Sequence, residues 1–134
     1  MYTNGDCTVF NRIYDPITRL DTWMATHLYG IFWENTKGAN VIKSGMKDAD
    51  GVRVFIPFAV GCDKAYCSPL AFKENPTTNV FTLRPEDKLV YGIVDHVGSI
   101  AGLADVFDCV ATITAVDTMN YGSADMQHWE VSGR

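Results

Sequence analysis

The sequence has no long apolar run, no cluster of basic residues and no internal repeat. None of its 134 residues belongs to an apolar stretch long enough to cross a bilayer. Its 11 basic residues are spread along the chain and are outnumbered by 16 acidic ones, which gives a formal net charge of −5. Modules that grip a phosphate backbone concentrate Lys and Arg on one face. The sequence therefore argues against a membrane-spanning protein and against tight binding of nucleic acid.

A secretory signal is also missing, because Met1 leads into a short segment without the basic and apolar regions that such signals need. We therefore expect the chain to be made in the cytoplasm and its four cysteines to remain free thiols. A length of 134 residues and an apolar fraction of 47% suit one domain that buries its own core. We predict a single β-barrel-like domain over residues 1–134.

Signatures of catalysis and metal binding are absent or incomplete. There is no Gly-x-Ser-x-Gly elbow and no His-Glu-x-x-His, and the three histidines are isolated. Cys62 and Cys67 are spaced like half of a zinc site, but a second closely spaced pair is missing. Asp48 and Asp50 resemble the start of a calcium loop that lacks its glutamate. We predict no enzyme activity, cofactor or metal, although the sequence leaves open a Cys–His pair formed only in the fold.

Strand signals are dense, with β-branched and aromatic residues between Gly, Asn, Asp and Pro. We predict strands at residues 7–14, 23–33, 52–58, 80–83, 89–94, 109–116 and 127–131, with 39–43 able to form a further short one. The second run is long enough to be a bent strand, and Gly30 marks the bend. The fold class predicted is mainly β, an antiparallel barrel or sandwich of about seven strands with one short helix and long loops. Its core should include Val9, Ile13, Val54, Ile56, Ile93, Val110 and Ile113.

The short helix is predicted at residues 99–107. Ser99 can cap its first turn, and four apolar residues follow at helical spacing: Ile100, Leu103, Ala104 and Phe107. Gly102 weakens this helix by about 1 kcal/mol. Residues 84–88 contain Pro85 and are predicted to form a tight turn between two strands.

Two irregular segments, 34–51 and 60–79, are too long for simple hairpin turns. The second carries three apolar side chains whose exposure costs roughly 25 cal/mol per Å² of apolar area. We therefore predict that these segments contact other subunits or line a channel. The candidate interface residues are Lys37, Lys43, Lys47, Asp48, Asp50, Tyr66, Leu70 and Phe72. The apolar ones could instead pack onto their own sheet.

The order of several segments resembles small proteins encoded in the head-to-tail region of tailed-phage and prophage genomes. The segments are VFNRIYDP at 9–16, DTWMAT at 21–26, GIFW at 30–33, ADGVRVFIP at 49–57, LRPED at 83–87, YGIVD at 91–95, DTMNYGS at 117–123 and HWEV at 128–131. They are most similar to the head-closure, or stopper, type. That resemblance implies a small β-barrel that assembles as a ring under the portal and adaptor, in the neck of the virion, and receives the tail. It implies a loop toward the DNA channel, passage of double-stranded DNA without sequence-specific binding, and no catalytic residues.

The physical properties of the chain are compatible with this role. An acidic chain attracts phosphate weakly, which suits a channel that DNA must traverse, and a ring needs apolar surface at heterologous contacts that close. The helix predicted at residues 99–107 suits a tail-completion or terminator protein equally well. The sequence is also compatible with a monomeric barrel that binds a small ligand or nucleic acid, and with a small enzyme that uses Cys62 or Cys67.

Overall fold

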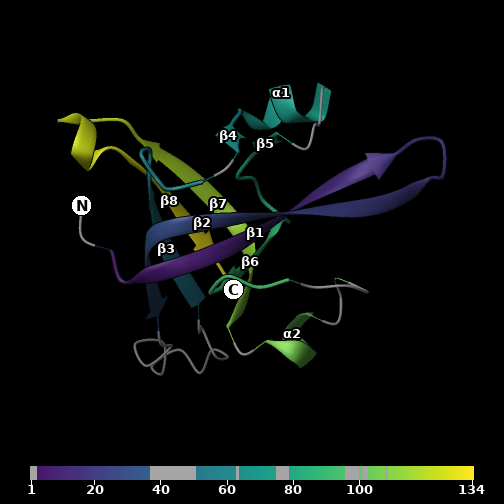
Figure 1. Ribbon diagram of the computed structural model, residues 1–134, viewed down its shortest axis with the longest axis horizontal. Helices are drawn as coiled ribbons and strands as arrows, with labels where there is room; N and C mark the ends of the chain where they lie inside the picture. Colours follow the sequence, from purple (N-terminus) through teal and green to yellow (C-terminus); the bar gives the residue numbers. More distant parts are fainter. Residues whose placement is uncertain are drawn as a thin grey trace, which may run out of the picture.

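The computed structural model describes residues 3–36, 51–62, 64–74, 79–95, 100, 103–107 and 109–134. Its main strands are β1 (Gly5–Asp15), β2 (Leu20–Thr36), β3 (Gly51–Pro57), β6 (Lys88–Tyr91), β7 (Val110–Met119) and β8 (His128–Gly133). These six form a closed barrel in the order β1-β2-β3-β8-β7-β6 (Figure 1). Neighbouring strands of the barrel pair antiparallel. The predicted fold class is confirmed.

Smaller elements accompany the barrel. Two short strands, β4 (Ala65–Tyr66) and β5 (Val80–Phe81), pair in parallel, and helix α1 (Pro69–Glu74) lies between them in the chain. Helix α2 (Leu103–Val106) precedes β7, and the 3-10 turn η3 (Ala124–Met126) lies between β7 and β8. The strand predicted at 39–43 lies outside the described residues. No helix among the described residues is both long and apolar enough to span a membrane.

Strand β2 is bent, as expected from its length. Its first part pairs with β1 up to Ile31, and from Phe32 onward it pairs with β3. The change of partner follows Gly30, which has a φ of +87°, and coincides with a register irregularity at Gly5. A left-handed backbone is accessible to glycine without steric cost, so a bulge can form here. The predicted bend at Gly30 is confirmed.

The core fills the barrel interior. Of the predicted core residues, Val9, Val54, Ile56 and Ile113 are fully buried. Ile13 and Val110 are only half-buried, and the prediction for Ile93 is wrong, because Ile93 is 38% exposed. β6 ends at Tyr91, so Ile93 lies beyond the sheet. The interior also holds residues that the sequence pattern does not single out, including Leu28, Ile31, Phe81, Leu89, Trp129 and Val131.

A second, smaller cluster covers the outside of β1 and β6. Phe10 and Val90 point away from the interior that Val9 and Leu89 fill, because successive side chains alternate between the two faces of a strand. Leu103 of α2 packs against this outer pair and is itself buried. The helix predicted at 99–107 is thus present as one turn at its C-terminal half, while the predicted cap at Ser99 lies outside the described residues.

Strands β1 and β2 continue well past the barrel as a two-stranded ribbon. β6 pairs with β1 only over residues 7–10, and β3 pairs with β2 only from residue 32. Beyond that region β1 and β2 pair with each other, from Asn11 with Met24 to Asp15 with Leu20. We call residues 11–24 the arm. Figure 1 shows it extending to the right, away from the barrel.

Candidate functional site

The tip of the arm is an exposed, partly apolar turn. Ile17 is 90% exposed, and Tyr14 and Leu20 beside it are also largely exposed. The turn is ordered by Asp15, whose carboxylate accepts a hydrogen bond from the Ile17 N–H at 2.9 Å and whose carbonyl accepts one from the Arg19 N–H at 2.7 Å. These two hydrogen bonds hold the apolar side chains of the tip in a defined conformation that a partner could cover. An isolated two-stranded ribbon is only marginally stable in water, so a partner on the tip would also stabilise the arm.

Buried polar side chains fix the root of the arm to the barrel. The Asn11 amide donates to the Thr82 carbonyl at 2.8 Å and to Asp87 Oδ2 at 2.8 Å, and its Oδ1 accepts from the Thr82 N–H at 3.2 Å. Asp87 also accepts from the Arg12 N–H at 3.3 Å and from Arg84 Nε at 2.9 Å. Arg84 in turn donates to the Arg12 carbonyl. This network holds the arm against residues 82–87.

Asp87 is the acceptor at the centre of this network. Burial raises the pKa of its carboxyl above the ordinary value, while hydrogen bonding from Asn11 and the charge of Arg84 act in the opposite direction. An ionised carboxylate at a site that is only 1% exposed depends on such donors. Asp87 therefore couples the conformation of the 84–87 turn to the position of the arm.

A cavity of about 490 Å³ lies between the arm and α1. It is lined by Arg12, Ile13, Tyr14, Pro16, Phe72, Lys73 and Arg84, which we call the basic cleft. Among these lining residues three are cationic and none is acidic. The Arg84 guanidinium lies 5.1 Å from the centre of the Phe72 ring and is paired with Asp87. The cleft therefore combines an apolar wall with three cationic side chains, of which Arg84 is paired with Asp87.

The apolar residues predicted as interface behave in two ways. Tyr66 packs against Trp129, with ring centres 4.3 Å apart, and against Phe81. Phe72 is 1% exposed. Tyr66 thus packs onto its own domain, and Phe72 is buried beside the Arg84 guanidinium instead of being left in water. Leu70, in contrast, is 68% exposed on α1. The remaining candidates lie outside the described residues: Lys37, Lys43, Lys47, Asp48 and Asp50.

Helix α1 is absent from the sequence-based prediction, although its sequence carries a start signal. Ser68 Oγ accepts a hydrogen bond from the Ala71 N–H at 3.3 Å, as an N-cap does, and Pro69 occupies the first helical position. The Ser-Pro pair could therefore have revealed the helix.

The sequence could not identify the cationic residues of the cleft, which are Arg12, Lys73 and Arg84. They belong to three segments that only the fold brings together.

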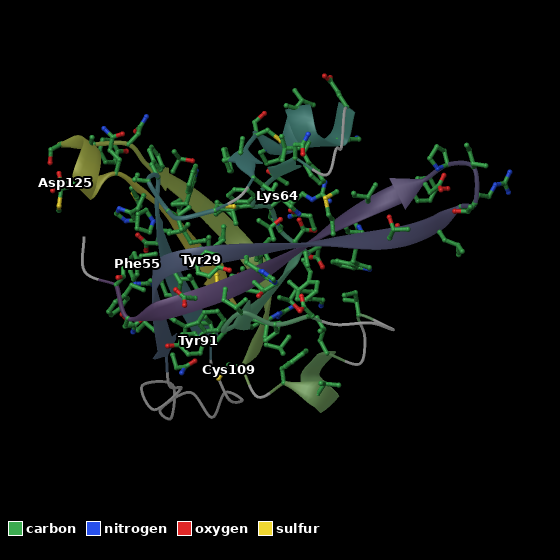
Figure 2. All side chains as sticks on the ribbon, viewed as in Figure 1. Tyr29, Phe55, Lys64, Tyr91, Cys109 and Asp125 are labelled. Carbon is green, nitrogen blue, oxygen red and sulfur yellow. The ribbon has the colours of Figure 1, made fainter. Side chains whose placement is uncertain are left out.

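A second projection lies at the turn between β7 and β8. Residues 117–127, which we call the β7–β8 tip, carry the exposed apolar side chains of Tyr121 and Met126. The Ser123 hydroxyl donates to Asp125 at 2.6 Å and holds the pKa of that carboxyl below its ordinary value. Figure 2 labels Asp125 at the left end of the molecule, and Figure 1 shows the arm at the right end. The two projections thus lie at opposite ends of the longest axis.

The four cysteines, all of which lie among the described residues, are thiols and form no disulfide. Burial raises the pKa of the Cys7 thiol strongly, and it also raises the pKa of Cys67. The thiolate is the nucleophilic form, so a raised pKa makes both thiols less reactive at neutral pH. Within the part of the chain that the structure describes, no three His, Cys, Asp or Glu side chains gather as a metal site requires.

A protein-family comparison matches nearly the whole chain. The matching family is described as "Family of unknown function (DUF6751)", and the match covers residues 2–134. Comparison with curated proteins and with solved structures gave no match.

Proposed function

The chain belongs to the family of unknown function DUF6751, and we propose that it is a structural subunit of a tailed-phage head-to-tail connector. In this proposal several copies form a ring below the portal and adaptor, close the DNA channel and receive the tail. The protein acts by assembly and carries out no reaction. The proposal starts from the segments that resemble head-closure proteins and is supported by the way the barrel presents its projections.

The observation that carries the proposal is the arm. A closed barrel has no free sheet edge through which to pair with a neighbour. Strand pairing through the barrel is thus closed off, and the arm offers a contact of another kind, with Tyr14, Ile17 and Leu20 exposed in an ordered turn. An extension of one copy that lies on a different surface of the next copy is a heterologous contact, and such contacts generate rings when they close.

The interior of the barrel favours an assembly role over ligand binding inside it. The main core cluster fills the interior with side chains contributed by the barrel strands and by Phe81 and Leu83. Small barrels filled in this way serve as packed scaffolds, whereas ligand-binding barrels keep a cavity. The net charge of −5 suits a wall along which DNA moves with little attraction.

Replacing Ile17 with aspartate should dissociate the assembly without unfolding the subunit. Burial of one isoleucine side chain contributes about 2–3 kcal/mol. The association constant of each contact should therefore fall by more than about tenfold. The fold should be unaffected, because Ile17 contacts solvent in the single chain. Sedimentation velocity over a concentration series measures the assembly, and thermal melts followed by circular dichroism measure the fold.

The matched control is Val106→Asp, which places the same charge at an exposed apolar residue of α2 rather than on the arm. We expect wild type and the control to form the same closed oligomer and Ile17→Asp to sediment as a monomer. A wild-type chain that stays monomeric at every concentration would contradict the ring. Equal oligomers for all three proteins would show that the arm tip is not part of the contact.

A further inference from the structure

We propose that the basic cleft of one copy receives the β7–β8 tip of a second copy of the same chain. This inference rests on the proposed ring and adds to the contact at the arm tip a second pair of surfaces that join neighbouring copies. The cleft is formed by arm residues 12–14 and 16, by Phe72 and Lys73 of α1 and by Arg84, and the β7–β8 tip lies at the other end of the long axis (Figures 1 and 2). Two different surfaces at opposite ends of a subunit can join copies in series.

The charges of the two surfaces are complementary. The cleft is lined by Arg12, Lys73 and Arg84 and by no acidic residue of the described chain. The tip contains Asp117 and Asp125, and the sequence 117–127 has no Lys or Arg. Both aspartates are exposed. Complementary potentials steer association and fix the register of the partners.

The apolar parts also match in kind and size. The accessible apolar wall of the cleft includes Ile13 and Pro16, with the buried Phe72 ring behind it. The tip presents Tyr121 and Met126, which are 73% and 55% exposed. A volume of about 490 Å³ admits a few side chains rather than a whole element. A methionine fits irregular apolar gaps because its chain is unbranched and flexible.

Both surfaces are held in shape before they meet. Arg84 is fixed by Asp87 and by the Phe72 ring. The tip turns at Gly122, with a φ of +78°, and is closed by the Met126 N–H donating to the Ser123 carbonyl at 2.9 Å and by the Gln127 side chain donating to the Gly122 carbonyl at 3.3 Å. Preorganised surfaces lose less conformational entropy on binding.

A charge exchange tests this contact. Lys73→Glu and Asp125→Lys should each weaken self-association by about tenfold or more, because each places like charges together. The double variant Lys73→Glu/Asp125→Lys restores opposite charges and should regain most of the wild-type association. Sedimentation velocity gives the association constants. Asp95→Lys is the matched control, since it makes the same change at an exposed residue beyond β6 and should associate like wild type.

Arg12→Glu reverses a charge of the cleft on the arm and replaces Lys73→Glu in this test if that variant fails to fold. Oligomers of wild type that are not affected by any of the exchanges would overturn the cleft-to-tip contact and leave the ring intact. Single variants that dissociate with no recovery in the double variant would also overturn it. A wild-type chain without oligomers would refute the proposed ring itself. Binding of inorganic phosphate that Lys73→Glu abolishes, with assembly unchanged, would show the cleft to be an anion site instead.

Discussion

Replacing Asp87 with alanine should lower the free energy of unfolding by about 3–4 kcal/mol. The substitution removes the acceptor for the Asn11 amide, for the Arg12 N–H and for Arg84 Nε. Asn11 is 1% exposed, so part of its amide loses its partner where water cannot replace it. The guanidinium of Arg84 is left without its counter-charge. The arm root should therefore loosen along with the global loss of stability.

Urea unfolding at a concentration where the chain is monomeric measures this effect. Asp21→Ala is the matched control, because Asp21 is an exposed aspartate on the arm, and it should change stability by less than about 0.5 kcal/mol. Hydrogen exchange of residues 11–15 should accelerate in the Asp87 variant and not in the control. Equal stability of the two variants would show that the network does not anchor the arm.

Replacing Trp129 with alanine should be at least as damaging, with a loss of about 3–5 kcal/mol. Trp129 on β8 is almost fully buried, and its ring lies 4.3 Å from that of Tyr66 and 4.5 Å from that of Phe58, measured between ring centres. The variant loses a large apolar surface and leaves a cavity in the main core cluster. Tyr66 also loses one of the two rings, Trp129 and Phe81, against which it packs.

The control for Trp129→Ala is Tyr121→Ala, which removes an aromatic ring that is largely exposed in the single chain. Under monomeric conditions it should stay within about 0.5 kcal/mol of wild type. If the Trp129 variant unfolds at the same urea concentration as this control, the packing of Trp129 against Phe58 and Tyr66 contributes little to stability.

Strand periodicity and turn chemistry are enough to predict a mainly antiparallel barrel or sandwich, and the structure shows that it is a closed barrel. Alternation along residues 52–58 and 109–116 identifies Val54, Ile56 and Ile113 as core, and the length of residues 23–33 with Gly30 identifies the bent strand. These features depend on residues close together in the sequence, so the pattern of side chains is enough to predict them. The prediction fails at Ile93 because alternation does not reveal where pairing with the neighbouring strand stops.

The site could not be predicted in the same way. The arm exists because β6 and β3 pair with only parts of β1 and β2, which is a property of the neighbours and not of the arm's own sequence. The cleft joins residues 12–14, 16, 72, 73 and 84, which no periodicity connects. The sequence predicts Tyr66 and Phe72 as interface residues, because a long loop is expected to leave them in water. In the structure they belong to β4 and α1, where Tyr66 packs against Trp129 and Phe72 is buried.

The central proposal, that the chain is a connector subunit, is tested most directly by quantitative mass spectrometry of infectious virions purified from a tailed phage or induced prophage whose genome carries its sequence. The account predicts its peptides in intact particles, in a small fixed copy number comparable with that of the portal and far below that of the major capsid protein. Infectious particles without any of its peptides would contradict the claim.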